Sequence, residues 1–226
     1  TFHSTTSYDS IPFAAGLQST QYLYSSKAFR MSINTICVCG AGTMGSGIAQ
    51  AAAQAGFFTL LYELNPAVLE KAKTGIEKNL QDLLEKKKIP VEEKERVIQR
   101  MQFTDDLQTC LADVFIEAVV EKPEVKVTLF NQLAEINHSE CIFTSNTSSL
   151  SITKIAEQVQ RPERVIGMHF FNPATIMKLV EVVKGRHVSD ETIEAVMNAA
   201  KKMGKTPVLL HKEIYGFLVN RFLQTT

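Results

Sequence analysis

The stretch Ile33–Gly45 reads Ile-Asn-Thr-Ile-Cys-Val-Cys-Gly-Ala-Gly-Thr-Met-Gly, an apolar segment followed at once by a glycine-rich turn. In a strand–turn–helix unit, Gly40 would permit the tight turn and Gly42 would let a pyrophosphate approach the backbone. Gly45 would let the following helix pack closely on the strand. The stretch therefore predicts a dinucleotide-binding turn, because a strand, a helix and a second strand all surround the glycines in the required order.

The residues around this turn indicate which dinucleotide it would hold. Thr43 and Met44 begin the following helix, whose free N–H groups and positive dipole end suit phosphates. Glu63 ends the next predicted strand, where this fold places an acid against the adenine ribose. Its carboxylate can accept hydrogen bonds from the ribose diol and would repel a 2′-phosphate. We therefore expect NAD rather than NADP, although an exposed acid at a strand end is the alternative interpretation.

Short apolar runs alternate with helical periods along the rest of the chain, which is typical of βαβ units. Most of the runs are too apolar to face water on either side, as in the central strands of a parallel sheet. We predict an α/β fold of the Rossmann type, doubly wound around a mainly parallel sheet. The expected strands are 33–39, 57–63, 114–120, 141–145, 165–171, 179–183 and 207–210. One expected helix begins near 68 and runs through the lysines at 86–88, and a second follows Pro90. Further helices are expected over 123–136, 152–158 and 190–203.

The composition excludes several classes of protein. The chain has 226 residues, 45% of them hydrophobic and 21% charged, and its formal net charge is zero. A balanced chain without a basic stripe argues against nucleic-acid binding, and no apolar run reaches the length of a membrane span. The cysteines fall in apolar stretches rather than in metal-ligand spacing, so we expect buried thiols, no metal site and no disulfide framework. They are Cys37, Cys39, Cys110 and Cys141.

Residues 1–30 are rich in Ser and Thr and show neither helical nor strand periodicity. We expect them to be a disordered or added extension outside the fold, which would begin at Met31. A mitochondrial transit peptide is the alternative, but an Arg-rich amphipathic face is missing. The protein is accordingly expected in the cytoplasm, or in the mitochondrial matrix if 1–30 is a transit peptide.

Two neighbouring runs supply a candidate acid–base pair. Gly167–Pro173 would close one strand and Lys178–Val183 would form the next, and a reversal centred near Thr175 would set His169 opposite Glu181. A carboxylate beside an imidazole stabilises the imidazolium, which suits a general base that takes a proton from a substrate hydroxyl. A hydrogen-bonded core histidine is the alternative.

Polar residues follow two further predicted strands. Ser145–Ser149 comes after the strand that begins at Cys141, and Glu121-Lys122-Pro123 follows Val120. Ligands bind at the carboxyl ends of strands in open α/β sheets, which makes both segments candidates. The alternatives are a helix cap for the first segment and a helix-entry turn for the second.

Five segments in a fixed order resemble the L-3-hydroxyacyl-CoA dehydrogenase family, which includes the bacterial 3-hydroxybutyryl-CoA dehydrogenases. They are GAGTMGSGIAQ, EAVVEKPEVKVTLF, SNTSSLSIT, GMHFFNPATIMKLVEVV and GFLVNR. The resemblance covers about residues 33–223. It implies NAD-dependent oxidation of an L-3-hydroxyacyl-CoA to a 3-oxoacyl-CoA, or the reverse reduction, as in fatty-acid β-oxidation.

The resemblance also implies roles for individual residues. His169 would be the base and Glu181 its partner, while Ser148 and Asn172 would hydrogen-bond the reacting oxygen and lie beside the cofactor. Asn220 matches a family position that lines the active site.

Further positions match residues that hold the two nucleotides. Glu121 and Lys126 would contact the nicotinamide side of NAD. Asn79 and Lys86 match positions that touch the coenzyme A moiety, so part of the lysine run would be functional rather than a solvated face.

The chain also departs from the family pattern. Family members usually continue after Asn220-Arg221 into a helical domain that closes the cleft and forms a homodimer, so we expect that domain to be largely missing. The expected organisation is an NAD-binding domain over 31–212 and the start of the helical domain over 213–226. Ile214-Tyr215-Gly216-Phe217 also replaces the usual Thr-Pro-Gly-Phe. A homodimer is in doubt for this reason, and two rival functions stay open, a non-catalytic NAD-binding module and a gulonate-type sugar-acid dehydrogenase.

Overall fold

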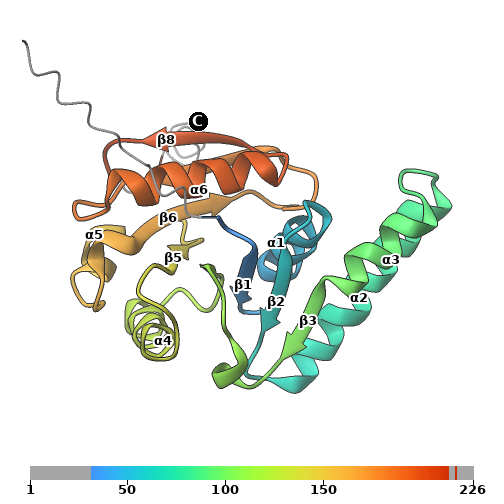
Figure 1. The fold of residues 1–226 in the computed structure, drawn as a ribbon, viewed down its shortest axis with the longest axis horizontal. Coiled ribbons are helices and arrows are strands. Elements are labelled where there is room, and N and C mark those ends of the chain that lie inside the picture. The colour runs from blue at the N-terminus through green and yellow to red at the C-terminus, as the bar shows by residue number, and fades with distance from the viewer. Residues whose placement is uncertain (1–31, 214–216, 218–226) are drawn as a thin grey trace, which may run out of the picture. The chain divides into compact units, whose positions relative to one another are not determined.

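The computed structural model describes residues 32–213 and Phe217, which form one sheet with helices on both faces (Figure 1). The strands are β1 Thr35–Cys39, β2 Phe58–Tyr62, β3 Met101–Thr104, β4 Val114–Glu117, β5 Ile142–Ser145, β6 Val165–Phe170, β7 Leu179–Val183 and β8 Thr206–Leu210. The helices are α1 Thr43–Gln54, α2 Pro66–Glu85, α3 Val91–Gln99, α4 Pro123–Ile136, α5 Ile152–Ala156 and α6 Asp190–Lys202.

The sheet has eight strands in the order β3-β2-β1-β4-β5-β6-β7-β8. Strands β1 to β6 are parallel, β7 is antiparallel to β6, and β8 is parallel to β7. The order β3-β2-β1-β4-β5-β6 is that of a doubly wound dinucleotide-binding sheet. The predicted Rossmann-type fold is therefore confirmed.

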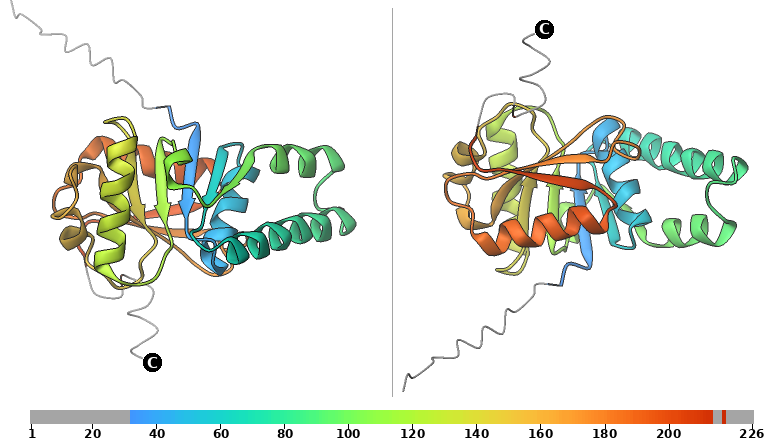
Figure 2. Two further views of the ribbon diagram at one scale, coloured as in Figure 1. Left: turned by 90° about the horizontal axis from the view of Figure 1, so that it is seen from below. Right: turned by 90° about the horizontal axis from the view of Figure 1, so that it is seen from above.

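The period of two along β1 explains how the two layers form. Ile36 and Val38 pack with α1, α2, α3 and α6, whereas Cys37 and Cys39 pack with α4 and α5 on the other face. Figure 2 shows the molecule from two opposite sides, with α4 in front of the sheet in the left view, α6 in front of it in the right view, and α2 and α3 extending together beside β3. All four cysteines are buried thiols, as the sequence predicts.

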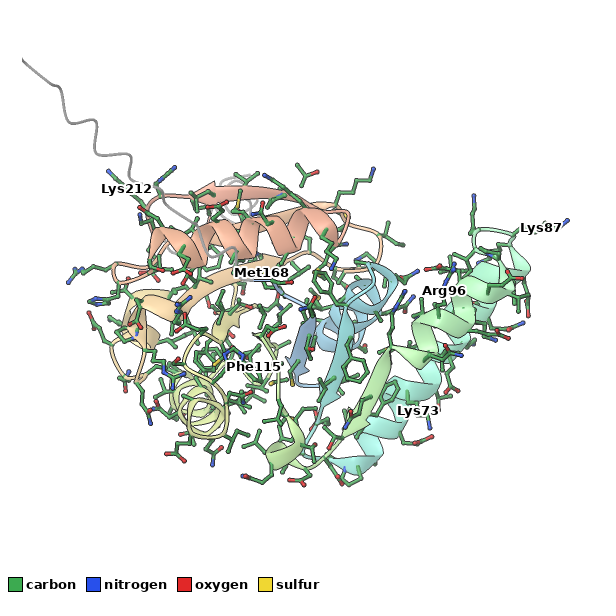
Figure 3. The ribbon with its side chains drawn as sticks, viewed as in Figure 1. Lys73, Lys87, Arg96, Phe115, Met168 and Lys212 are labelled. Carbon is green, nitrogen blue, oxygen red and sulfur yellow. The ribbon has the colours of Figure 1, made fainter. Side chains whose placement is uncertain are left out.

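Aromatic side chains fill the layer between the sheet and α4. The rings of Phe115 and Phe143 stack with centroids 5.6 Å apart, and Phe130 lies 5.3 Å from Phe143. Figure 3 shows Phe115 in this interior position, while Lys87 projects from the far end of the α2–α3 pair. Apolar packing of this kind stabilises the sheet that carries the loops described below.

Three elements differ from the sequence prediction. The edge strand β3 was not predicted, because it is only four residues long and its side chains are at most partly buried. Strand β4 stops at Glu117 instead of Val120, since the Glu117 carboxylate accepts the Val119 N–H at 2.8 Å and turns the chain. Helix α2 ends before the lysine run, where Lys87 adopts a left-handed backbone conformation with φ 52°.

Within residues 32–213, no helix is both long enough and apolar enough to span a bilayer. The expected extension 1–30 lies outside the described residues, as do Asn220 and most of the segment 213–226.

Candidate functional site

The glycine turn between β1 and α1 has the geometry that its sequence predicts. Gly40 has φ 102°, and a Cβ there would lie 2.6 Å from the Ala118 carbonyl oxygen. A Cβ on Gly45 would lie 1.7 Å from the Gly40 carbonyl oxygen, so α1 approaches the turn too closely for any side chain. No atom lies within 4 Å of a Cβ built on Gly42, which leaves open space at the helix N-terminus. Open space before free N–H groups at a helix N-terminus is what the approach of a pyrophosphate requires.

Glu63 lies directly after β2 and braces the same turn. Its Oε2 accepts the Ala41 N–H at 3.0 Å, and its Oε1 accepts the Asn65 N–H at 3.0 Å. The residue borders a cavity of about 600 Å³ between the glycine turn, the end of β2 and the exposed face of α4. We call this space the Glu63 cavity; it has the carboxylate and the apolar walls that an adenosine group requires.

A second cavity, of about 420 Å³, lies between the start of α1, one face of α2 and the loop after β6. Its lining includes Gly42, Lys71, Asn79 and Asn172, and we call it the Asn79 cavity. The structure therefore brings Asn79 and Asn172 together with the glycine turn. Lys86 is the C-cap of α2 and is not part of this lining.

His169 and Glu181 face one another on β6 and β7, in the register that the reversal near Thr175 predicts. The His169 Nδ1 atom lies 2.8 Å from Glu181 Oε2. Both side chains are almost fully buried, with 9% and 1% exposure. The ring centroid of His169 lies 4.7 Å from that of Phe171 and 5.6 Å from that of Phe217. The carboxylate and the flanking rings restrict the orientation of the imidazole, as a general base requires.

The polar segment after β5 lies beside the end of β6. The Asn146 side-chain oxygen accepts the Phe170 N–H at 2.8 Å, which ties this loop to the strand of the histidine. The helix-cap interpretation of Ser145–Ser149 is wrong, because Ser151 caps α5 and accepts the Lys154 N–H. Ser148 is half-buried in the loop.

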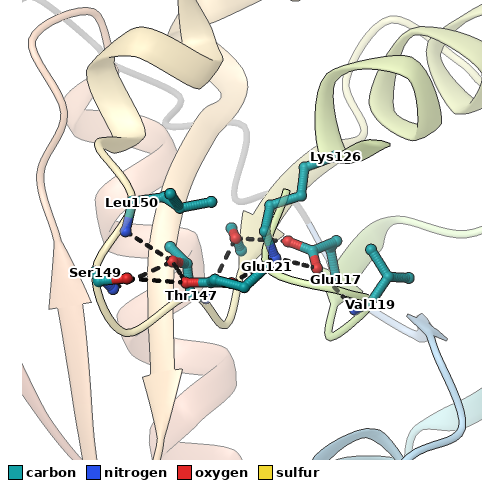
Figure 4. A network of polar contacts seen from close by, with 8 residues as sticks. Glu117, Val119, Glu121, Lys126, Thr147, Ser149 and Leu150 are labelled. Atoms are coloured by element: carbon teal, nitrogen blue, oxygen red, sulfur yellow. Dashed lines mark hydrogen bonds and ion pairs between the residues drawn. The ribbon is translucent and has the colours of Figure 1, made fainter. Parts of the chain in front are cut away.

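A chain of charged groups joins the β4 loop to the β5 loop (Figure 4). The Lys126 ammonium lies 2.6 Å from Glu117 Oε1 and 3.1 Å from Glu121 Oε2. Thr147 and Ser149 donate their hydroxyls to Glu121 Oε1. Glu121 and Lys126, predicted together from the sequence, are therefore in direct contact.

The two carboxyl groups of this chain have opposite pKa shifts. Burial raises the pKa of Glu117 above its ordinary value, although the Lys126 charge and the Ser145 hydroxyl act against it. Burial also acts to raise the pKa of Glu121, but the Thr147 hydroxyl and Lys126 outweigh it and hold the pKa below its ordinary value. Glu121 is therefore a carboxylate at neutral pH.

Two residues of these sites were missed by the sequence analysis. Lys71 shares the cavity-facing side of α2 with Asn79, which the helical period could have indicated. Glu117 is a fully buried acid within an apolar strand, and such a residue needs a charged or hydrogen-bonding partner. The acid in the run Val114–Val120 was therefore an available signal.

Comparison with known proteins agrees with this arrangement. Residues 35–214 match the family described as 3-hydroxyacyl-CoA dehydrogenase, NAD binding domain. The chain is 44% identical over 192 residues to 3-hydroxyadipyl-CoA dehydrogenase of Escherichia coli, with 84% of this chain and 40% of that protein covered. It is 46% identical over 194 residues to a probable 3-hydroxybutyryl-CoA dehydrogenase of Bacillus subtilis, with 85% of this chain and 67% of that protein covered.

A solved structure shows the same fold. The (S)-3-hydroxybutyryl-CoA dehydrogenase of Ralstonia eutropha superposes with a TM-score of 0.82 at 39% identity, covering 85% of this chain and 68% of that one. This chain thus spans between about two fifths and two thirds of the length of these proteins. The family is the one that the five sequence segments indicate, and its NAD-binding character agrees with the glycine turn. The chain belongs to the family of 3-hydroxyacyl-CoA dehydrogenase NAD-binding domains.

Proposed function

We propose that this protein oxidises an L-3-hydroxyacyl-CoA to the 3-oxoacyl-CoA with NAD, or catalyses the reverse reduction. The observation that carries the proposal is the buried contact of 2.8 Å between His169 Nδ1 and Glu181 Oε2. A dehydrogenase that oxidises an alcohol needs a base for the hydroxyl proton, and this pair is suited to that task. The names of the relatives, which refer to dehydrogenases of 3-hydroxyadipyl-CoA and 3-hydroxybutyryl-CoA, support the substrate class.

In the proposed reaction, His169 takes the hydroxyl proton on Nε2 while its Nδ1–H donates to Glu181. The Glu181 carboxylate stabilises the imidazolium that forms, because the two opposite charges meet in a buried setting. NAD, when bound, would accept the hydride that leaves the carbon bearing this hydroxyl. Ser148 and Asn172 hydrogen-bond the substrate oxygen as it becomes a carbonyl. Asn220, which lies outside the described residues, is proposed to line the same site.

The residues around the glycine turn are suited to hold NAD. The open space at Gly42 receives the pyrophosphate, and the first turn of α1 with Thr43 and Met44 offers its N–H groups. The carboxylate of Glu63, at the border of the Glu63 cavity, accepts the ribose hydroxyls. We place Glu121 on the nicotinamide side of the cofactor, with Lys126, which the resemblance assigns to the same place, directly behind it.

The Asn79 cavity is proposed to hold part of the coenzyme A moiety. Asn79 supplies an amide and Lys71 a cation to its lining, and Asn172 borders it on the side of the catalytic strand. A cation suits the phosphate groups of coenzyme A. We place Lys86 farther along the same moiety, beyond the cavity. The proposed reaction belongs to fatty-acid β-oxidation, in the cytoplasm or in the mitochondrial matrix, and a homodimer is proposed only if the helical domain is present.

The direct test is NADH oxidation by this chain with acetoacetyl-CoA, followed by NADH absorbance. Consumption of NADH that depends on acetoacetyl-CoA is expected, and a gulonate-type sugar acid with NAD is expected to give no turnover. Quenching of NADH fluorescence without any acetoacetyl-CoA-dependent consumption would instead identify a non-catalytic NAD-binding module. Turnover of the sugar acid alone would assign the protein to the sugar-acid class.

A further inference from the structure

We propose that Glu117 is a positioning residue of the cofactor site, which acts through Lys126 on the carboxylate of Glu121. This inference rests on the proposed placement of Glu121 on the nicotinamide side of NAD. The three residues form one continuous chain of charges, from the buried Glu117 to the partly exposed Glu121 (Figure 4).

Glu117 is held by several groups although its side chain has no exposed surface. Its Oε1 lies 2.6 Å from Lys126 Nζ and accepts the Val119 N–H at 2.8 Å, while its Oε2 accepts the Ser145 hydroxyl at 2.6 Å. A buried ion pair adds little stability compared with apolar residues of the same volume, because both charges lose their hydration. Stability alone therefore does not account for an acid at this position.

Lys126 cannot present its charge directly to a ligand in this arrangement. Its side chain is only 1% exposed, and its ammonium lies between Glu117 Oε1 and Glu121 Oε2. Glu121, in contrast, is 41% exposed. The surface that meets the cofactor is therefore the Glu121 carboxylate, and Lys126 sets its position from behind.

The position of Glu117 in the sheet places this chain of charges between the glycine turn after β1 and the polar segment after β5. Glu117 is the last residue of β4, and it pairs with Cys39 on β1 and with Ser145 on β5. Cys39 directly precedes the glycine turn, and Ser145 begins the polar segment that reaches Glu121 through Thr147.

The partly exposed Glu121 carboxylate can accept hydrogen bonds from donors such as the hydroxyls of a ribose or the N–H groups of a carboxamide. Both donors occur in the nicotinamide half of NAD. The adenosine half is expected to meet Gly42 and Glu63, neither of which bonds to Glu117, Lys126 or Glu121. The loss of Glu117 should therefore weaken the binding of the nicotinamide half selectively.

The test compares two ligands in Glu117→Gln. NADH carries both halves, whereas ADP lacks both the nicotinamide and its ribose, and both Kd values can be measured by calorimetry. The Kd for NADH is expected to rise about tenfold, the effect of losing one charge-assisted contact, with the Kd for ADP unchanged. The control is Glu140→Gln, which removes a carboxylate from the nearly buried Arg164 and lies before the start of β5, whereas Glu117 lies at the end of the parallel strand β4. Neither Kd should change in this control.

A double-mutant cycle tests whether Glu117 acts through Lys126. Glu117→Gln/Lys126→Met should weaken NADH binding no more than Lys126→Met alone, because residues that act in one chain are not additive. This double variant also avoids leaving a lone buried charge. If Glu117→Gln does not fold, as judged by circular dichroism, Ser145→Ala replaces it, with a smaller loss of the same selectivity expected.

Equal weakening of NADH and ADP binding in Glu117→Gln would overturn the inference, because it would indicate a general structural role. Additive losses in the double variant would overturn it as well, since Glu117 would then act independently of Lys126. A wild-type chain that binds NADH but does not consume it with acetoacetyl-CoA would remove the proposed reaction, while the two Kd ratios would still decide the role of Glu117.

Discussion

The imidazole of His169 and the carboxylate of Glu181 meet across the only antiparallel pairing among the described strands, with Nδ1 2.8 Å from Oε2. Each strand contributes one of the two side chains, so the contact exists only because β6 and β7 pair. The chain reverses between β6 and β7, and the Asn172–Lys178 loop that makes the reversal also borders the Asn79 cavity. One reversal thus supplies both the acid–base pair and a wall of the proposed substrate site.

His169→Gln is expected to lower kcat for acetoacetyl-CoA reduction by about 10²-fold or more, the usual contribution of a general acid or base. Glutamine keeps a polar side chain but cannot transfer a proton at neutral pH. The measurement is steady-state NADH oxidation, together with the Kd for NADH from fluorescence quenching, which should not change. A variant with wild-type kcat would exclude His169 from the mechanism.

Glu63→Gln is expected to reduce the preference for NADH over NADPH about tenfold, measured as the ratio of the two Kd values. Glutamine keeps a hydrogen-bond acceptor for the Ala41 N–H but removes the charge that repels a 2′-phosphate. The matched control is Glu77→Gln on the exposed surface of α2, which should leave the ratio unchanged. An unaltered ratio in Glu63→Gln would show that this carboxylate does not select the cofactor.

The four cysteines are expected to resist alkylation by iodoacetamide in the folded protein. All are buried, and burial raises the pKa of the Cys141 thiol to about 11. At pH 8 the raised pKa alone leaves Cys141 with about a hundredfold less thiolate, the reactive form, than an ordinary cysteine has. Mass spectrometry should show no labelling of the native chain and four labels after denaturation in guanidinium. Rapid labelling of the native protein would contradict the described packing.

Several features of the site follow from short stretches of chain. The roles of Gly40 and Gly45 depend on one turn and the helix that follows it, so their spacing was sufficient to predict them. The pairing of His169 with Glu181 was also predictable, because an antiparallel reversal over a few residues leaves few possible registers. Strand β3 was not, since a short edge strand with partly exposed side chains carries a weak pattern.

Local periodicity was enough to predict the glycine turn, the long helices and every strand except β3, because backbone sterics and the burial of apolar side chains act over a few neighbouring residues. The neighbourhood of Glu117 depends instead on the order of the strands. Its hydrogen bond with Ser145 joins residues 28 positions apart, and the pairing of β4 with β5 brings them together. The placement of α4 beside β4 decided that Lys126 would neutralise this buried acid, because the low dielectric of the interior requires a partner but does not select one.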